Sequence, residues 1–334
     1  MTVLVTGGSG LVGSHVIEAL RSRGEPVRAL VRSASRAAVE RLGAEAVPGD
    51  VTDGAAWRLA ARGVRAVVHA AALVQRRATW ERYVAVNVDG TRHAVEAARA
   101  TGAPLVHISS VAVYGGSGAY PRVRERRAEE YPFQPIADHD FYARSKRMAE
   151  AVVRDAAADG SLAAVALRPN VIYGERDRQF TPRVVRVVRL GFAPRIGPGT
   201  NHLSCVYAGN VAAAVLATLD APAAGFRTYN VTSDAAPPLT QREFLAAFAE
   251  VLGTRLRAIP IPVGLAHLIM GLWLAPRLAR AAVSFVTSDN PYVDDRARAD
   301  LGWRPPLAAR DAVRRTALWF AENETPRRSR PGHR

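Results

Sequence analysis

The segment TGGSGLVG at residues 6–13 restricts the possible folds of this chain more than any other feature. The residues before it, Thr2 to Thr6, are apolar enough for a short buried strand. The residues after it, from about Ser14 to Arg23, have the spacing of an amphipathic helix, which Gly24 would end. Val27 to Val31 has the pattern of a second strand. Strand, glycine turn, helix and strand in so short a span predict a parallel α/β unit.

Three glycines of this turn have distinct physical roles in such a unit. Gly7 permits the tight turn, Gly10 removes a Cβ that would keep a phosphate away from the backbone, and Gly13 lets the helix pack closely on the strand. The free N–H groups at the helix N-terminus then face the phosphates. The sequence therefore predicts a dinucleotide site, with a tight turn that binds nothing as the alternative.

The end of the second strand bears on which dinucleotide binds. An acidic residue there binds the ribose 2′-hydroxyl, whereas an arginine accommodates a 2′-phosphate. The strand ends at Arg32, and residues 33–36 contain no acid. We therefore expect NADP(H). NAD(H) stays possible, because arginine is abundant in this chain and Arg32 could be an ordinary surface residue.

Strand and helix patterns continue to alternate after residue 40. A third strand is expected over residues 46–50, a fourth over 64–69, a helix over 87–100 and a fifth strand over 105–109. This alternation predicts an α/β fold with a Rossmann-type doubly wound parallel sheet. The third strand is expected to end at Asp50-Val51, where Asp50 either accepts a hydrogen bond from adenine or forms a turn.

Polar residues that could act in catalysis follow the fifth strand. Ser109 and Ser110 stand at its carboxyl end, the edge where such sheets bind ligands. Tyr142 and Lys146 are four residues apart on a predicted helix and so share one face. A tyrosine with an ordinary pKa of about 10 is a poor base, and a nearby cation lowers that value. Lysine can also donate to ribose hydroxyls.

Lys146 is exceptional in this chain, because it is the only lysine among 45 lysines and arginines. Arginine is wider and planar, and it would fit this dual role less well. A tyrosine and a cation sharing a helix by chance is the alternative, but the glycine turn and the strand-end serines make it improbable.

Composition and charge exclude several other classes of protein. A single cysteine, Cys205, excludes an internal disulfide and a thiolate-rich metal site. His107, His202 and His267 lack the spacing of metal ligands, so we expect no metal. The net charge of +15 comes from arginines spread along the chain without a nucleic-acid motif, so we expect no nucleic-acid partner.

The longest apolar stretch, residues 258–275, is interrupted by Pro260 and Pro262. Its uninterrupted part, residues 263–275, is too short for a membrane span, which needs about 20 apolar residues. We expect a helix over an apolar substrate pocket, with a helix on a membrane surface as the alternative, because Arg277 and Arg280 follow it. The chain opens without a signal peptide, so we expect a cytoplasmic protein.

Five segments together resemble the extended short-chain dehydrogenase/reductase family, of the NAD(P)-dependent epimerase/dehydratase type. They are TGGSGLVG (6–13), NVDGT (87–91), SSVAVYG (109–115), YARSK (142–146) and LRPNVIYG (167–174). The resemblance implies that Tyr142 is the general acid and base, that Lys146 tunes it and holds the ribose, and that Ser110 orients the reacting oxygen.

Several departures bear on the substrate. The dehydratases of this family have an Asp-Glu pair where Val111-Ala112 stand, and its sugar-nucleotide epimerases usually have Asn and Arg where Val171 and Leu203 stand. The segments 202–216, 226–253 and 290–305 resemble instead the 3β-hydroxysteroid dehydrogenase and dihydroflavonol-reductase-like group. The resemblance therefore implies an oxidoreductase for a hydrophobic hydroxyl or carbonyl compound.

We expect a dinucleotide-binding domain at 1–174, a substrate-binding part at 175–325 whose residues 203–218 pack on the first, and a basic flexible tail at 326–334. The family resemblance implies a homodimer through the helices that begin near Asn87 and Tyr142. A nucleotide-sugar epimerase with tightly bound NAD and a non-catalytic NADP(H) sensor are the alternatives. The residues that we expect to line the cofactor are Gly7, Gly10, Leu11, Val12, Gly13, Arg32, Asp50, Val51, Ala70, Ala71, Asn87, Ser109, Tyr142, Lys146, Pro169 and Val171.

Overall fold

The computed structural model describes residues 2–74, 77–116, 125–221, 224–273 and 276–323, with the side chains of 273–279 left out. The predicted tail at 326–334 lies outside the described residues.

A seven-stranded parallel sheet forms the centre of the molecule, in the order β10-β6-β5-β4-β1-β2-β3. The strand order reverses between β1 and β4, which confirms the predicted doubly wound fold. The strands are β1 (Thr2–Thr6), β2 (Val27–Val31), β3 (Glu45–Pro48), β4 (Val64–His69), β5 (Leu105–Ile108), β6 (Ala164–Pro169) and β10 (Phe226–Val231).

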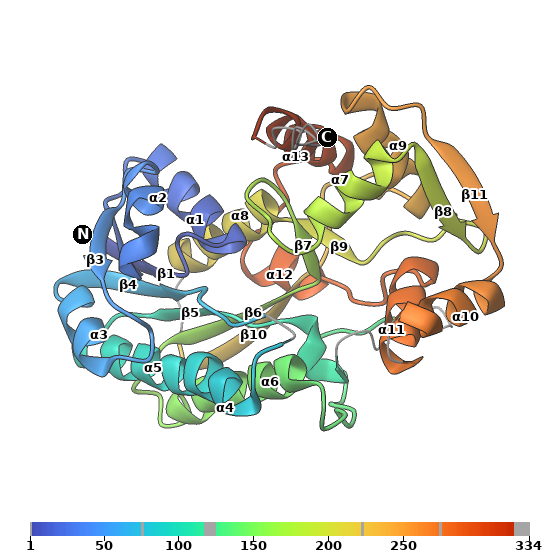
Figure 1. Ribbon diagram of the computed structural model, residues 1–334. Coiled ribbons are helices and arrows are strands. Elements are labelled where there is room, and N and C mark those ends of the chain that lie inside the picture. Colours follow the sequence, from blue (N-terminus) through green and yellow to red (C-terminus); the bar gives the residue numbers. More distant parts are fainter. Residues whose placement is uncertain (1, 75–76, 117–124, 222–223, 274–275, 324–334) are drawn as a thin grey trace, which may run out of the picture.

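Helices cover both faces of this sheet, because its strands alternate side chains between two apolar cores. Val3 and Val5 face one core, and Leu4 faces the other. Figure 1 shows α1 (Leu11–Ser22), α2 (Arg36–Glu40) and α8 (Ala208–Asp220) on one side of the sheet. The other side carries α3 (Gly54–Ala60), α4 (Trp80–Tyr83), α5 (Gly90–Thr101) and α6 (Phe141–Ala156).

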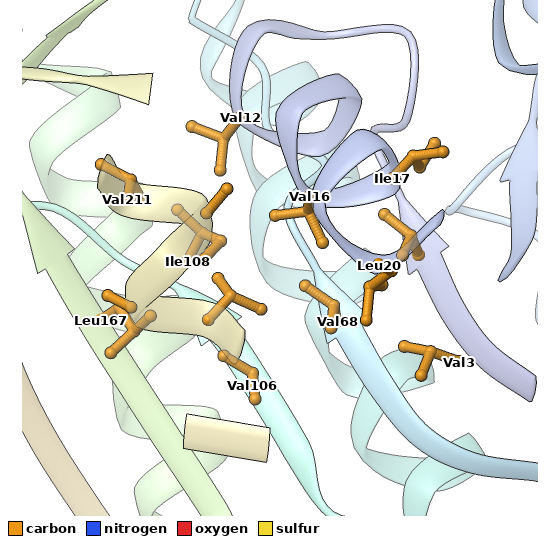
Figure 2. Close-up of a cluster of buried hydrophobic side chains, with 14 of the residues drawn as sticks. Val3, Val12, Val16, Ile17, Leu20, Val68, Val106, Ile108, Leu167 and Val211 are labelled. Carbon is orange, nitrogen blue, oxygen red and sulfur yellow. The ribbon is translucent and has the colours of Figure 1, made fainter. Parts of the chain in front are cut away.

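The first core fixes α1, the helix that follows the glycine turn. Figure 2 shows Val12, Val16, Ile17 and Leu20 of this helix facing the sheet and α8. Because α8 lies against α1, the second half of the chain contributes to the core beneath the predicted cofactor site. The sheet also takes its outer strand, β10, from beyond residue 174.

Three predicted boundaries differ from the structure by two residues or more. α1 begins at Leu11 and not near Ser14, because Gly13 is a helical residue packed against Gly7. β3 ends at Pro48, because Asp50 folds the chain into a turn with Thr52. The helix expected from Asn87 is divided at residue 90. Residues Val84–Asp89 form a π-helical turn, η2, before α5 begins.

The C-terminal half adds two small parallel sheets and a group of helices. One sheet pairs β7 (Val171–Tyr173) with β9 (Cys205–Tyr207), and the other pairs β8 (Phe192–Ile196) with β11 (Arg257–Ile261). The helices are α7 (Thr181–Arg189), α9 (Gln241–Val251), α10 (Val263–Trp273), α11 (Pro276–Thr287), α12 (Asp295–Asp300) and α13 (Ala309–Asn323), and two 3-10 turns are η1 (Ser33–Ser35) and η3 (Val111–Tyr114). No helix of the described residues has the length and apolar character that crossing a membrane requires.

Candidate active site

The glycine turn between β1 and α1 is packed too closely for side chains at Gly7 and Gly13, but it leaves open space beside Gly10. A Cβ on Gly7 would lie 2.7 Å from the amide nitrogen of Ala71, and one on Gly13 would lie 2.3 Å from the carbonyl oxygen of Gly7. Gly7 also has a positive φ of 71°, which side chains rarely adopt. The space beside Gly10 is open, since a Cβ there would meet only the carbonyl oxygen of Gly7 within 4 Å.

The N-terminus of α1 has no capping side chain, because its N-cap residue is Gly10. The amide groups of the first turn, at Leu11 and Val12, are therefore the donors that a diphosphate would meet. The side chain of Val12 points away from this site into the core, as Figure 2 shows. An anionic diphosphate fits this open, donor-lined turn, so the turn supports the predicted dinucleotide site.

Two predicted adenosine-side residues lie close together after β2 and β3. Arg32 is exposed, and its guanidinium has no hydrogen bond or ion pair within the described residues. The carboxylate of Asp50 accepts hydrogen bonds from the amide and hydroxyl of Thr52, at 3.0 and 2.9 Å. Burial opposes ionisation of Asp50, but Thr52 and the charges of Arg82 and Arg32 lower its pKa. Asp50 thus forms a turn, and Val51 accepts the indole N–H of Trp57 at its carbonyl oxygen.

Asn87 holds the segment after β4 against α6. Its amide group donates to the carbonyl oxygen of Leu73 at 3.1 Å and to the hydroxyl of Ser145 at 2.9 Å, and its oxygen accepts from the amide of Leu73. The small residues Ala70 and Ala71, which lie beside the glycine turn, belong to this segment. Asn87 therefore holds in place the segment after β4, which lines the predicted cofactor site.

Ser110 and Tyr142 come together at the carboxyl end of β5. Ser110 caps η3, where its hydroxyl accepts the amide of Ala112 at 3.2 Å. Tyr142 lies in the first turn of α6, and the hydroxyl of Ser110 is close enough to its phenol to affect the pKa of that phenol. Burial raises the pKa of Tyr142, and the neighbouring hydroxyl of Ser110 opposes that rise.

Lys146 lies one turn further along α6 and is almost fully buried, with 2% of its surface exposed. Its ammonium donates to the carbonyl oxygen of Ile108. Burial lowers the pKa of Lys146 to about 8, and the carboxylate of Glu150 opposes this shift. This ammonium is held under the edge of the sheet and is not among the groups that shift the pKa of Tyr142.

Glu150 and Arg168 were missing from the predicted site. Glu150 extends the row of Tyr142 and Lys146 by one more turn, and its carboxylate accepts the hydroxyl of Ser109 at 2.5 Å. The guanidinium of Arg168 binds both oxygens of Glu150, and neither side chain is more than 5% exposed. The spacing of Glu150 from Lys146 was the signal in the sequence that could have identified it.

This buried ion pair joins the neighbours of several predicted site residues. Ser109 precedes Ser110, Arg168 precedes Pro169 at the end of β6, and Glu150 follows Lys146 on α6. Val171 lies just beyond Pro169, at the start of β7. The carboxyl ends of β5 and β6 and the inner face of α6 are thereby held in one arrangement.

Two histidines lie beneath Lys146 in neighbouring strands. His69 of β4 and His107 of β5 are buried and stack with ring centroids 5.6 Å apart. Burial and the charge of Lys146 lower the pKa of His69 to about 3 and that of His107 well below its ordinary value. Both rings are therefore neutral at physiological pH. No cluster of three or more potential metal ligands occurs in the described residues.

Known proteins are similar to this chain in sequence and in fold. The NAD dependent epimerase/dehydratase family model matches residues 3–232. A 4-hydroxy-2-methyl-3-oxo-4-farnesyl-3,4-dihydroquinoline-1-oxide ketoreductase of Stigmatella aurantiaca is 32% identical over 91% of this chain and 92% of its own length. Human 3 beta-hydroxysteroid dehydrogenase type 7 is 32% identical over 96% of this chain and 95% of its own length.

Among solved structures, the UDP-glucose 4-epimerase of Thermus thermophilus, a complex with NAD, aligns with a TM-score of 0.72. It is 26% identical, and the alignment covers 97% of this chain and all of that one. The glycine turn, the strand order and these matches agree with one another. The chain therefore belongs to the NAD-dependent epimerase/dehydratase family and is an NAD(P)-dependent enzyme of the extended short-chain dehydrogenase/reductase type.

Proposed function

We propose that this enzyme transfers a hydride between NADP(H) and the carbonyl or hydroxyl carbon of a hydrophobic small molecule. The observation that carries the proposal is that Ser110 and Tyr142 come together at the carboxyl end of β5, with Lys146 one helical turn away. The pair offers two hydroxyl groups to a single substrate oxygen, which is what a carbonyl needs as it becomes an alkoxide.

In the reduction of a carbonyl compound, Tyr142, Ser110 and Lys146 have different roles. Bound NADPH supplies the hydride from C4 of its nicotinamide ring. Tyr142 donates its proton to the substrate oxygen, so that hydride and proton together convert the carbonyl to an alcohol. Ser110 donates a hydrogen bond to the same oxygen and orients it. Lys146, held by Ile108, is placed to bind the ribose hydroxyls of the cofactor.

The substrate class rests on the departures from the sugar-nucleotide enzymes and on the names of relatives. Val111 and Ala112 offer no acid or base for dehydration. Leu203 packs into the apolar core of the C-terminal half, so that position offers no cation to a diphosphate. The ketoreductase and the steroid dehydrogenase reported above both act on apolar ring compounds with oxo or hydroxyl groups, according to their names.

The preference for NADP(H) is supported by Arg32. Its guanidinium lies at the end of β2 and is free, within the described residues, to pair with a 2′-phosphate. A homodimer through α5 and α6 is part of the same proposal, since these two helices lie side by side on one outer face of the sheet.

A nucleotide-sugar epimerase is the second candidate, because a structural neighbour has that activity. Such an enzyme would oxidise and re-reduce its substrate on NAD that never leaves, and it would show no net use of the cofactor. The residues at 171 and 203 argue against it. A non-catalytic sensor of NADP(H) would need neither Tyr142 nor Lys146.

Replacing Tyr142 with Phe tests the proposed function. We expect a turnover lower by about 10²–10⁴-fold with a panel of cyclic and long-chain ketones, because the proton donor is lost. NADPH binding, followed by fluorescence, should be unchanged. Tyr229→Phe is the matched control, because Tyr229 lies on β10 with its hydroxyl bound to Asp300 and should not matter for turnover. Equal turnover in wild type and Tyr142→Phe would refute the assigned role.

A further inference from the structure

The helix α10 presents apolar side chains to solvent along its whole length. Leu265, Leu268, Ile269 and Leu272 are all exposed, the last by 77%. Their spacing of i, i+3, i+4 and i+7 places them on one face of the helix, which we call the outer stripe. An isolated exposed leucine needs no explanation, but an exposed apolar stripe marks an interaction surface.

The opposite face of α10 packs against the rest of the protein, so the core contacts of this helix do not involve the outer stripe. Ala266 is buried against Ile196 of β8 and Val283 of α11, and Met270 packs on the same cluster. The helix is thus apolar on both faces, and no charged residue occurs between Val263 and Trp273. Figure 1 shows α10 at the outer edge of the molecule, on the far side from β3.

The apolar surface extends beyond the helix onto its neighbours. Thirteen large apolar side chains are exposed in the described part of the chain. Eight of them belong to α10 or to the adjacent region of β8 and β11, and these are Leu190, Phe192, Ile259, Val263, Leu265, Leu268, Ile269 and Leu272. This concentration in one region distinguishes the surface from scattered exposure.

The charge around this surface is mainly positive. Residues 178–219 and 251–288, which build β8, β11, α10 and α11, contain nine arginines and no aspartate or glutamate. The acidic residues that flank the second range, Glu250 and Asp289, are paired with Arg310 and His202. Arg255, Arg257 and Arg280 are exposed, and none of them forms an ion pair within the described residues. The complement of an apolar stripe with unpaired arginines around it is a surface that is apolar inside and anionic at its border.

We propose that the outer stripe of α10 docks this enzyme onto an anionic lipid bilayer, with the leucines in the acyl boundary and the arginines at the headgroups. The helix has 11 residues and so is about 16 Å long, short of the roughly 30 Å of a bilayer core, and it lies along the interface. A second copy of the chain fits this surface worse, because it would bring the same arginines face to face.

Vesicle cosedimentation of the full chain tests this proposal, with equal parts phosphatidylglycerol and phosphatidylcholine against phosphatidylcholine alone. We expect binding to the anionic vesicles to be stronger and to weaken with salt. Leu268→Gln/Leu272→Gln should lower it by about tenfold or more, because two inserted side chains are lost. Arg255→Gln/Arg257→Gln should lower it by about fivefold for each arginine on the anionic vesicles, with little change on the neutral ones.

Leu59→Gln/Leu318→Gln is the matched control, because both leucines are exposed elsewhere, on α3 and α13. Circular dichroism checks that each variant is folded, and the assay needs no turnover, so it is independent of the proposed function. The proposal is overturned if the wild type stays in solution with anionic vesicles, or if the control variant loses as much binding as the α10 variant. It is also overturned if the wild type self-associates through the stripe and ignores lipid.

Discussion

The catalytic edge of the sheet and the outer stripe of α10 differ in where they place charged and apolar side chains. At the catalytic edge, Lys146, Glu150 and Arg168 are buried, and each charge has a partner within the protein. At the outer stripe, leucines are exposed beside arginines without partners in the described residues. The charges of the first region are paired within the chain itself. The exposed leucines and unpaired arginines of the second region are those that another surface would cover.

The largest expected effect comes from breaking the buried ion pair. Glu150→Gln leaves the guanidinium of Arg168 buried without a counter-charge, and we expect a loss of about 3–5 kcal/mol of unfolding free energy. Denaturant unfolding measures this. Asp220→Asn is the control, because it breaks the exposed pair of Arg23 and Asp220, whose side chains are 42% and 52% exposed. That change should cost less than about 1 kcal/mol. Similar losses in both variants would mean that burial does not distinguish the two regions.

Glycine substitutions sharpen the same contrast. Gly13→Ala pushes a methyl group against the carbonyl oxygen of Gly7, so we expect a loss of about 1–3 kcal/mol and weaker NADPH binding. Gly264→Ala in α10 meets nothing within 4 Å, and it should stabilise the helix by up to about 1 kcal/mol. Thermal unfolding of both variants checks the opposite signs. A stabilising Gly13→Ala would contradict the close packing of the turn.

Much of the catalytic half could be predicted from the sequence, since glycine turns and alternating apolar runs reflect local requirements. The strands at 2–6, 27–31 and 64–69 were predicted with their observed bounds. The role of Glu150 was missed because its partners, Ser109 and Arg168, come from other strands. The sequence left open whether α10 covers a pocket or lies on a surface, because an apolar run has the same composition in both places.

Substitution of Arg32 tests whether its unpaired guanidinium binds the 2′-phosphate of NADPH. Arg32→Ala should weaken NADPH binding by about tenfold and leave NADH binding unchanged, because only NADPH carries the 2′-phosphate. Arg36→Ala is the control, since the guanidinium of Arg36 is paired with Glu40 at 2.7 Å. Fluorescence titration of both cofactors measures the affinities. Equal losses for NADPH and NADH would refute the preference for NADP(H).

The smallest expected effect on stability comes from Glu175, which pairs with His15 of α1. Burial alone would raise the pKa of Glu175, but the hydrogen bond and charge of His15, aided by Tyr207, lower it to about 2. A lowered carboxyl pKa contributes stability that is present above the ordinary value of 4.5 and is lost as the pH falls toward 2. Glu175→Gln should therefore be less stable than wild type at neutral pH, and the difference should shrink below pH 4.5. Urea unfolding at several pH values measures it, and a difference that grows in acid would contradict the assigned shift.

The central claim is net hydride transfer, and one isotope experiment tests it most directly. NADPH deuterated at both hydrogen positions of C4 of the nicotinamide is mixed with the enzyme and with ketones from the panel, and the products are examined by mass spectrometry. The account predicts one deuterium on the new alcohol carbon for each NADPH consumed, with Tyr142→Phe strongly impaired. Unlabelled product, no use of NADPH and a stoichiometric NAD released on denaturation would contradict it and favour the epimerase.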